Sequence, residues 1–443
     1  MSDQKQTVAI VCGGGPAPGM NGVISAVTLE AHRQGWDVLG MYEGFSHLAK
    51  GEKKYVKLTD DDVSRIHLQG GCVLQMSRYN PTKKEEDLSA VVNTLKELGV
   101  TYLVTIGGDD TAFSSMTVAA HATKSGHTIR SVHVPKTIDN DLPLPEGIPT
   151  FGFETARALG ALEAANLMED ARTANQRWYF VVAMGRTAGH LALGIGKAAG
   201  APVTVFPEEF SAEKIPLHQV VDILVGSIIK QKAAGRSYGV AVIAEGVIEK
   251  IMEEDLKMLG DLALDEHGHI RYAELDFGDI LKQQAMRELD RLGVKMTIVD
   301  KEIGYELRCT SPIPYDIDYT RSLGYAAVHF LQEGNSGAMI TIQKDGAVPM
   351  YFDDIKDPAT GKTRVRRVNI DSAAYKIARG FMVRLEKEDL ANAEIAKASF
   401  TVIPEEYRFT GVSINLLHSE NSIISSIFLL ISARVIPSIA PFR

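Results

Sequence analysis

The sequence predicts an α/β protein with mostly parallel β-sheets, and three observations support this fold class. Short apolar runs rich in β-branched residues alternate with stretches of helical periodicity along most of the chain. The loops that follow the apolar runs are rich in glycine or in polar residues. The chain has 443 residues, which suffices for two or three domains of about 150 residues each.

The first strand, loop and helix show the pattern clearly. A strand is predicted over Thr7–Cys12, a loop over Gly13–Gly19, and a helix from there to about Gln34. One face of this helix is apolar, because hydrophobic side chains recur at helical spacing at Met20, Val23, Ile24 and Val27.

The pattern continues through the rest of the chain. Further strands are predicted at Tyr102–Ile106, Ser131–Val134, Trp178–Ala183, Val203–Phe206, Gly239–Ala244 and Thr297–Ile303. Helices are predicted between most of them, including Leu88–Leu98, Thr111–Ala119, Glu154–Arg172 and Ala188–Ala199. Late in the chain, Asp345 and Gly346 separate two apolar runs, which indicates an antiparallel hairpin of Ala338–Gln343 and Ala347–Phe352.

The prolines Pro143, Pro145 and Pro149 interrupt the periodicity and suggest a domain boundary near residue 145. We therefore expect an N-terminal lobe over 1–145 and a second lobe over 146–410, parts of which cross back to the first. Residues 411–443 form an apolar tail to which we assign no function. Its run Ile423–Ile431 is too short to cross a hydrocarbon core of about 30 Å. A docked hydrophobic tail is one interpretation, and a non-native reading frame or a poorly ordered extension is the alternative.

Composition excludes several classes of protein. Lys and Arg total 47 against 56 Asp and Glu, and this net charge of −9 argues against nucleic acid as a partner. The three cysteines, Cys12, Cys72 and Cys309, form neither a disulfide framework nor a zinc motif, which favours a reducing, cytoplasmic location. The N-terminus carries no recognisable targeting signal, and no membrane partner is expected.

Ligands of open parallel sheets bind at the carboxyl ends of the strands, and three loops of this chain stand out there. In the first, Gly13, Gly14 and Gly15 allow backbone N–H groups to approach an anion without a Cβ in the way. The helix that follows directs its positive end to the same place. The loop matches neither the dinucleotide fingerprint nor the P-loop, so a tight turn without a ligand is the alternative.

The second loop follows Tyr102–Ile106 and contains the adjacent carboxylates Asp109 and Asp110. Two carboxylates at one strand end repel each other, and a bound Mg²⁺ would neutralise them with the oxygen ligands it prefers. The alternative is that one of them is the N-cap of the helix Thr111–Ala119.

The third loop follows Ser131–Val134 and places Lys136, Thr137, Asp139 and Asp141 within six residues. Phosphoryl transfer to an alcohol needs such a set: a base for the hydroxyl proton, a cation for the phosphoryl oxygens and a nearby metal. An Asx-type turn is the structural alternative.

Taken together, these loops resemble those of the phosphofructokinases, in particular the pyrophosphate-dependent 6-phosphofructokinases. The resemblance runs from about Val8 to Tyr407 and includes three later motifs in the expected order, Met184-Gly185-Arg186, Ala244-Glu245-Gly246 and Gly304-Tyr305-Glu306-Leu307-Arg308. NAD kinases and lipid kinases share the Gly-Gly-Asp element but lack Thr-Ile-Asp-Asn-Asp and Met-Gly-Arg. We therefore expect two Rossmann-like, three-layer α/β lobes with the active site in the cleft between them.

The resemblance implies the reaction of pyrophosphate with fructose 6-phosphate to give phosphate and fructose 1,6-bisphosphate, reversibly. On the donor side it implies that Gly13, Gly14 and Gly15 hold the donor phosphate and that Asp109 ligates Mg²⁺. It implies that Asp139 is the general base toward the 1-hydroxyl group. Thr137 and Ile138 line the same contact, and Lys136 and Arg186 assist the transfer.

On the sugar side, the resemblance implies that Met184, Gly185 and Arg186 hold the sugar phosphate and that Glu245 accepts hydrogen bonds from its hydroxyl groups. Tyr305 and Arg308, in the segment with Glu306 and Leu307, are expected to flank the 6-phosphate. Arg177 by itself suits a surface cap or a phosphate ligand. The resemblance favours a ligand that reaches into a neighbouring subunit's site, and hence a homodimer or homotetramer. One departure is Val299: members with a histidine in place of Tyr305 usually carry an arginine at this position. Lys295 and Lys301 are the candidates to replace it here.

Two residues indicate the donor. ATP-using members carry glycine at the positions of Asp110 and Lys136. A carboxylate at 110 would repel an α-phosphate, and a cation at 136 would supply charge that the short pyrophosphate needs. The alternative is that Asp110 only caps a helix and Lys136 faces solvent. An ATP-dependent kinase and a non-catalytic sugar-phosphate-binding protein are the competing functions. The second is disfavoured because Asp109 and Asp139 are both present.

Overall fold

A computed structural model describes residues 5–258, 272, 275–344, 346–359, 363–386 and 389 of the chain. The chain forms two compact units. Unit 1 contains Met1–Leu159 and Gly304–Arg367. Unit 2 contains Gly160–Ile303 and continues from Val368. The apolar tail expected at 411–443 lies outside the described residues.

The units divide within helix α5 (Phe153–Ala174), between Leu159 and Gly160, and not near residue 145. The proline-rich stretch around residue 145 belongs to unit 1, where Leu142 and Leu144 are buried against Phe352. Helical periodicity runs without interruption across the true division, so the local pattern gives no signal for it.

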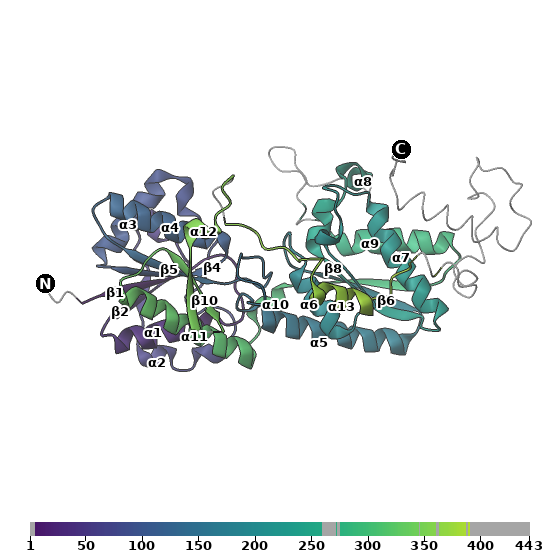
Figure 1. The fold of residues 1–443 in the computed structure, drawn as a ribbon, viewed down its shortest axis with the longest axis horizontal. Helices are drawn as coiled ribbons and strands as arrows, with labels where there is room; N and C mark the ends of the chain where they lie inside the picture. Colours follow the sequence, from purple (N-terminus) through teal and green to yellow (C-terminus); the bar gives the residue numbers. More distant parts are fainter. Residues whose placement is uncertain are drawn as a thin grey trace, which may run out of the picture. The chain divides into compact units, whose positions relative to one another are not determined.

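Unit 1 is built on a seven-stranded sheet in the order β11-β10-β5-β4-β1-β2-β3 within the described residues. The parallel strands are β1 (Thr7–Cys12), β2 (Asp37–Met41), β4 (Tyr102–Gly107), β5 (Arg130–Pro135) and β10 (Ala338–Gln343). The edge strands β3 (Tyr55–Lys57) and β11 (Gly346–Tyr351) are antiparallel to their neighbours. Figure 1 labels β1, β2, β4, β5 and β10 of this sheet. The predicted late hairpin is confirmed. The strands β2 and β3 were not predicted, because both are short and Gly40 interrupts the first.

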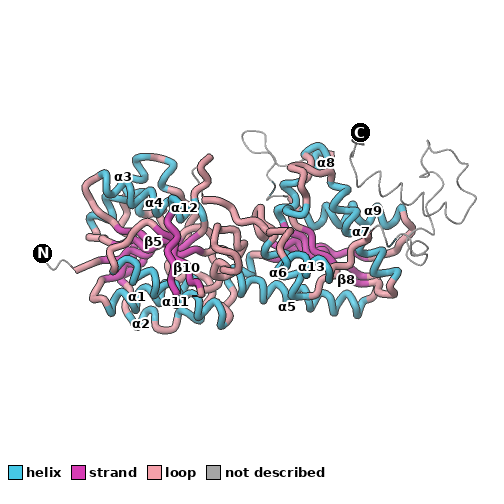
Figure 2. The backbone as a smooth tube through the Cα atoms, viewed as in Figure 1, coloured by secondary structure: helices cyan, strands magenta, loops and turns pink. Residues whose placement is uncertain are grey.

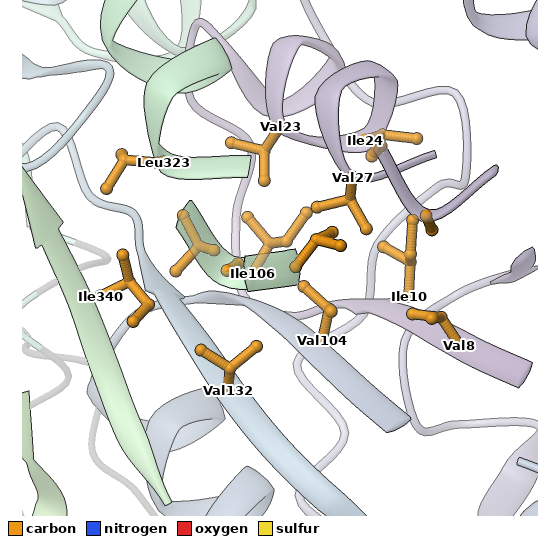
Figure 3. Packing of buried hydrophobic residues seen from close by; sticks show 14 of the residues in the cluster. Val8, Ile10, Val23, Ile24, Val27, Val104, Ile106, Val132, Leu323 and Ile340 are labelled. Atoms are coloured by element: carbon orange, nitrogen blue, oxygen red, sulfur yellow. The ribbon is translucent and has the colours of Figure 1, made fainter. Parts of the chain in front are cut away.

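Alternation along β1 explains why unit 1 has three layers. Val8 and Ile10 point to one face of the sheet, where they pack against α1 (Met20–Arg33) and α11 (Pro314–Gln332), as Figure 3 shows. Ala9 and Val11 point to the other face and pack against α3 (Glu85–Glu97) and α4 (Asp109–Lys124). Each fully buried Val or Ile contributes roughly 1.5–3 kcal/mol, so this alternation fixes the register of the central strands.

Unit 2 is built on a parallel four-stranded sheet in the order β7-β8-β6-β9 within the described residues. Its strands are β6 (Arg177–Ala183), β7 (Val203–Val205), β8 (Tyr238–Ala244) and β9 (Thr297–Ile303). Its main helices are α6 (His190–Ala199), α7 (Leu217–Ala233) and α9 (Phe277–Arg291). Figure 2 shows helices beside the strands in this unit as in unit 1. The expected α/β class with mostly parallel sheets is confirmed.

Several short helices complete the two units. In unit 1 these are α2 (Asp60–Val63), α10 (Tyr305–Cys309) and α12 (Phe352–Ile355); in unit 2 they are α8 (Glu253–Lys257) and α13 (Ala373–Phe381), with the 3₁₀ turns η4 (Pro207–Glu209) and η5 (Glu245–Lys250). No helix in the described ranges combines the length and the apolar character needed to span a membrane.

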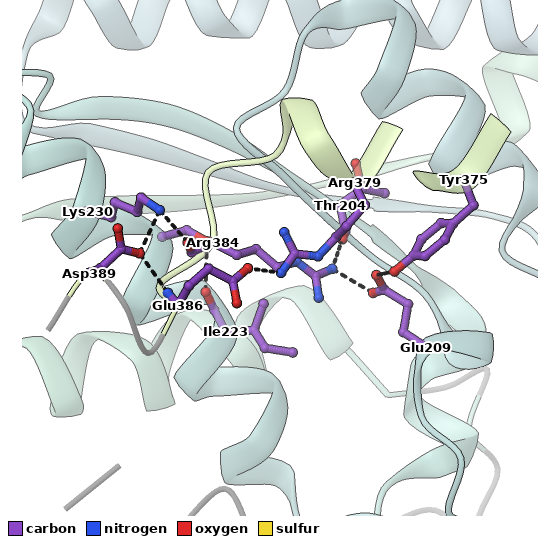
Figure 4. Close-up of polar contacts among 10 residues, drawn as sticks. Thr204, Glu209, Ile223, Lys230, Tyr375, Arg379, Arg384, Glu386 and Asp389 are labelled. Carbon is purple, nitrogen blue, oxygen red and sulfur yellow. Dashed lines mark hydrogen bonds and ion pairs between the residues drawn. The ribbon is translucent and has the colours of Figure 1, made fainter. Parts of the chain in front are cut away.

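The segment from α13 to residue 389 is held onto unit 2 by charged side chains (Figure 4). Glu209 accepts hydrogen bonds from the Arg384 guanidinium at 2.6 Å and from the Tyr375 hydroxyl at 2.8 Å. The Lys230 ammonium pairs with Asp389 at 2.6 Å. Because Glu209 and Arg384 are both largely buried, this pair is shielded from solvent and fixes the segment more firmly than a surface pair would.

Candidate active site

In unit 1 the strand register brings the three predicted loops to one edge of the sheet. Cys12 pairs with Ile106, and Ile106 pairs with Val134, so the parallel strands β1, β4 and β5 end side by side. The glycine loop after Cys12, the Asp109 loop and the Lys136 loop therefore begin at the same level. The expectation that these loops lie together is confirmed.

The glycine loop is held by its own backbone hydrogen bonds. The Gly13 N–H donates to the Ile106 carbonyl and the Gly14 N–H donates to the Ser77 carbonyl, each at 2.9 Å. These two amides are therefore not directed at a ligand, and the expectation that successive amides line a phosphate site is wrong for them. Ser77, which braces the loop, was missed because no local pattern links residues so far apart in sequence.

Three side chains lie near the glycine loop: the contact excludes a Cβ at Gly13, whereas a left-handed backbone favours glycine at Gly14. A Cβ on Gly13 would lie 2.3 Å from the Thr111 hydroxyl oxygen. A Cβ on Gly14, which has a left-handed φ of 83°, would lie 3.5 Å from Lys136 Nζ. On Gly15 it would lie 3.3 Å from Arg308 Cζ. The loop is thus flanked by two cationic side chains, an arrangement suited to an anion.

Lys136 is buried, and this burial lowers the pKa of its ammonium group to about 8. The negative charge of Asp139 opposes that shift, whereas the positive charge of Arg308 adds to it. The alternative that Lys136 faces solvent is wrong. An anion bound between Lys136 and Arg308 would relieve their mutual repulsion and favour the charged ammonium.

Asp109 and Asp110 are the first two residues of α4, and the N-cap position is taken by Gly108. The alternative that one of them is the N-cap is therefore wrong. Both carboxylates lie in the first helical turn, where the helix dipole favours negative charge. Asp110 is exposed and Asp109 is half-buried.

A second buried residue, His133, joins the Asp109 and Lys136 loops. One ring nitrogen lies 2.9 Å from the Thr105 hydroxyl and the other lies 3.0 Å from the Gly107 carbonyl. That carbonyl also accepts the Lys136 N–H at 2.8 Å. Burial lowers the pKa of His133 to about 3, so the ring is neutral and donates from one nitrogen only. The sequence offered one signal for it: a polar residue inside an apolar strand.

The loop that carries Asp139 is folded on itself. Thr137, Ile138 and Asp139 are all buried. The Asp139 N–H donates to the Thr137 hydroxyl at 3.0 Å, and the Thr150 hydroxyl donates to the Thr137 carbonyl at 2.7 Å. The turn holds Asp139 in place, and Asp139 is close enough to Lys136 to affect its pKa.

The short helix α10 contributes Arg308 and Tyr305 to this edge of unit 1. The Arg308 guanidinium lies 5.2 Å from the Tyr305 ring centre, and Tyr305 is 76% exposed. Glu306 accepts the Gly304 N–H at 3.1 Å, and the Leu307 side chain is fully buried. Arg308 and Tyr305 therefore provide the polar side chains of α10 at this edge, while Glu306 and Leu307 fix the position of the helix.

In unit 2, Met184, Gly185 and Arg186 follow β6, and Glu245 follows β8. Ala183 pairs with Ala244, so these two loops start side by side at the carboxyl edge of the sheet. Arg186 has a left-handed φ of 50°, and a Cβ on Gly246 would lie only 2.1 Å from the Arg186 carbonyl oxygen. The close contact between the two loops thus requires Gly246.

Arg177 lies at the opposite end of β6 from Met184. The six steps from Arg177 to Ala183 span roughly 20 Å at about 3.3 Å per residue, so the structure does not bring Arg177 to the Met184 loop. Its guanidinium pairs with Asp170 at 3.0 Å, and this contact raises the pKa of Arg177. Val299, in the middle of the neighbouring strand β9, pairs with Tyr179.

A parallel α/β sheet whose edge carries a glycine loop flanked by cations, next to carboxylates, defines a phosphate-binding protein equipped for phosphoryl transfer. The family model for phosphofructokinase matches residues 7–331. The chain belongs to the phosphofructokinase family, which confirms the resemblance seen in its motifs.

Two curated relatives are similar over most of their length. The pyrophosphate–fructose 6-phosphate 1-phosphotransferase of Thermotoga maritima is 52% identical over 395 residues, covering 88% of this chain and 93% of that protein. The enzyme of the same name from Naegleria fowleri is 50% identical over 401 residues, covering 88% and 91%. A crystal structure of a pyrophosphate-dependent phosphofructokinase from Marinobacter aquaeolei aligns with a TM-score of 0.65 over 89% of this chain and 92% of that one. At 18% identity, that match supports the fold alone.

Proposed function

We propose that this chain transfers a phosphoryl group from pyrophosphate to the 1-hydroxyl group of fructose 6-phosphate, giving phosphate and fructose 1,6-bisphosphate. The relatives at 52% and 50% identity carry the name of this reaction. The observation in the structure that carries the proposal is the glycine loop flanked by Lys136 and Arg308, with Asp139 close enough to affect Lys136.

Each side of the reaction then has its residues. Asp139 takes the proton of the attacking hydroxyl, while Thr137 and Ile138 shape the same pocket wall. Lys136 stabilises negative charge on the transferring group. Burial disfavours the protonated form of Lys136, and a bound anion offsets that cost. The absence of side chains in the glycine loop leaves room for Lys136 and Arg308 beside the donor.

The proposed sugar-phosphate contacts come from three other segments. Arg186, with Met184 and Gly185, binds the sugar phosphate, and Glu245 accepts from its hydroxyl groups. Tyr305 and Arg308 flank the 6-phosphate. The adjacent Met184 and Glu245 loops support this assignment because both follow paired strands at one sheet edge.

Asp109 is the residue proposed to hold Mg²⁺. Within the described residues no three His, Cys, Asp or Glu side chains form a group that could hold a metal ion. A single carboxylate fits Mg²⁺ nonetheless, because this ion is commonly bound by one or two carboxylates together with substrate phosphates. When bound, it would supply charge neutralisation for the pyrophosphate oxygens. Asp109 would orient it beside the glycine loop.

Pyrophosphate rather than ATP is the proposed donor. Asp110 is exposed in the first turn of α4, where its carboxylate repels a longer polyphosphate, and Lys136 is a buried cation. A coupled assay comparing the two donors tests the proposal on the wild-type chain, and activity with ATP alone would overturn it. The Asp110→Gly variant should lower the KM for ATP and leave pyrophosphate use largely intact.

A cytoplasmic location and a homodimeric or tetrameric state with shared sites complete the proposal. The three cysteines are free thiols, which suits a reducing compartment. Arg177 lies about 20 Å along its strand from the Met184 loop, which leaves it suited to a neighbouring subunit's site.

A further inference from the structure

We propose that Arg366 is a positioning residue for the general base Asp139, because it fixes the backbone of the loop that carries the base. We call residues 137–150 the base loop. The inference rests on the proposed function, since it assumes that Asp139 acts as the base. It assigns a role to an arginine more than 200 residues away from the base loop in sequence.

The Arg366 side chain donates to several backbone carbonyls of the base loop. Its Nε donates to the Asn140 carbonyl at 3.0 Å. One terminal nitrogen donates to the Ile148 carbonyl at 2.8 Å, and it also lies 3.3 Å from the carbonyls of Leu144 and Pro145. The other donates to the Asn140 side-chain oxygen. The Arg366 backbone N–H adds a bond to the Asp141 carbonyl at 2.7 Å.

The composition of the base loop explains why it needs an external donor. Pro143, Pro145 and Pro149 have no N–H group, so the loop has few donors of its own for its carbonyls. Buried carbonyls without a donor are costly. Arg366 meets this need with a planar group of five N–H donors, and the Tyr319 hydroxyl donates to the Pro149 carbonyl at 3.0 Å.

The link to Asp139 runs through its neighbour Asn140. Asn140 has a left-handed φ of 57°, an uncommon conformation for a residue with a side chain. Arg366 holds both its carbonyl and its side-chain oxygen, and that same side-chain oxygen accepts the Thr150 N–H at 3.0 Å. Release of Asn140 to negative φ would rotate the peptide that follows Asp139 and displace the carboxylate.

Arg366 is charged at neutral pH in spite of its surroundings. Burial lowers the pKa of its guanidinium to about 10, and the nearby charge of Asp141 opposes this shift. A lysine would keep the positive charge but not the planar arrangement of donors on three nitrogens, because its three N–H donors all belong to one nitrogen atom. Arg366→Lys is therefore expected to be a poor substitute.

The test compares Arg366→Ala and Arg366→Lys with Arg364→Ala. Arg364 is a matched control: it is an exposed arginine two positions away that donates to the Asp354 carbonyl, outside the base loop. Displacement of a catalytic group by about 1 Å can cost about 100-fold. We expect kcat to fall about 10- to 100-fold in both Arg366 variants, with both KM values changed less than about threefold, and no change in Arg364→Ala.

Two further readouts separate positioning from general stability. Hydrogen exchange of peptides spanning residues 140–150 should be faster in Arg366→Ala than in wild type, and unchanged in Arg364→Ala. In an Asn140→Gly background, where the left-handed conformation needs no support, the effect of Arg366→Ala on kcat should shrink. If Arg366→Ala does not fold, Arg366→Lys, alone and in the Asn140→Gly background, decides the question.

The outcomes distinguish this inference from the proposed function. Wild-type protein without pyrophosphate-dependent transfer would overturn the function. Active wild type, an inactive Asp139→Asn variant, and Arg366 variants with full kcat would overturn only the role of Arg366. The role of Arg366 would also be overturned if Arg366→Ala lowered kcat by the same factor in the Asn140→Gly background as in wild type.

Discussion

Lys136 has a buried ammonium group whose pKa lies near physiological pH. Its burial disfavours the charge, and the neighbouring Arg308 repels it, so the free protein holds a cation that lacks full compensation. A dianionic or trianionic ligand stabilises this ammonium group most, because its negative charge replaces the solvation that burial removes. Under the proposed function, this charge would help to bind a small donor that has no adenosine group.

The pH dependence of pyrophosphate use follows from this pKa. The protonated amine is the form that attracts pyrophosphate, so kcat/KM for pyrophosphate should fall as pH rises through about 8. In the pH profile of kcat, the decline should occur at higher pH, because bound pyrophosphate favours the protonated form of Lys136. Initial rates from pH 6.5 to 10 measure both. Lys136→Arg should lose the decline near pH 8, and a flat wild-type profile from pH 7 to 9 would contradict the assignment.

Asp139→Asn tests the base directly. The amide keeps the size of the side chain and its capacity for hydrogen bonds but cannot take a proton. We expect kcat to fall by roughly 10²–10⁴, with little change in substrate affinity. Asp353→Asn, at an exposed carboxylate on α12, is the control and should be neutral. Near-full kcat of Asp139→Asn at saturating substrates would refute the role.

At the scale of elements, the parallel strands of the two sheets place the proposed functional loops by register. In unit 1 the ends of β1, β4 and β5 coincide, and in unit 2 those of β6 and β8 coincide. Close approach between neighbouring loops is then possible only where one of them has no side chain. Gly13 beside Thr111 and Gly246 beside Arg186 are the two tightest cases at the site.

Gly246→Ala should disturb the sugar-phosphate half of the site without unfolding unit 2. The new Cβ would lie 2.1 Å from the Arg186 carbonyl oxygen, so the Met184–Arg186 loop must move. We expect KM for fructose 6-phosphate to rise about tenfold or more, with KM for pyrophosphate little changed. Gly380→Ala is the matched control, since nothing lies within 4 Å of the position its Cβ would take. Equal effects on both KM values would contradict this reasoning.

At the scale of the whole molecule, the chain passes from unit 1 to unit 2 between Arg367 and Val368, and it is anchored on both sides. Arg366 binds the base loop in unit 1. The Val368 N–H donates to Glu208 at 2.9 Å, and the same carboxylate accepts the Gly189 N–H at 3.1 Å in unit 2. One short segment therefore contacts loops next to proposed site residues in each unit.

Complementation tests the proposed shared site. Arg177 pairs with Asp170 at a solvent-accessible position, where the pair is screened and the guanidinium can exchange its partner for a phosphate. If Arg177 serves a neighbouring subunit, mixing inactive Asp139→Asn and Arg177→Ala chains should restore part of the activity, because one hybrid site keeps both residues. Each variant alone at the same total concentration is the control. Verified mixed dimers without recovery would rule out a shared site.

Local pattern alone determined the main elements of this protein and the segments that carry its chemistry. The strands Thr7–Cys12 and Thr297–Ile303 were predicted with their observed bounds, because alternation and β-branched composition are local properties. The motifs indicated the family for the same reason: a loop that binds phosphate needs glycines and charged residues at fixed short spacing.

Only the tertiary structure decided which distant groups meet. Arg308 beside Gly15, Ser77 on the Gly14 amide, and Arg366 across the base loop each join segments dozens to hundreds of residues apart. The division of units inside α5 is equally invisible, because the helix keeps its period while its packing partners change. These features depend on long-range packing and on which buried carbonyls need a hydrogen-bond donor. Neither can be read from the residues that are adjacent in the chain.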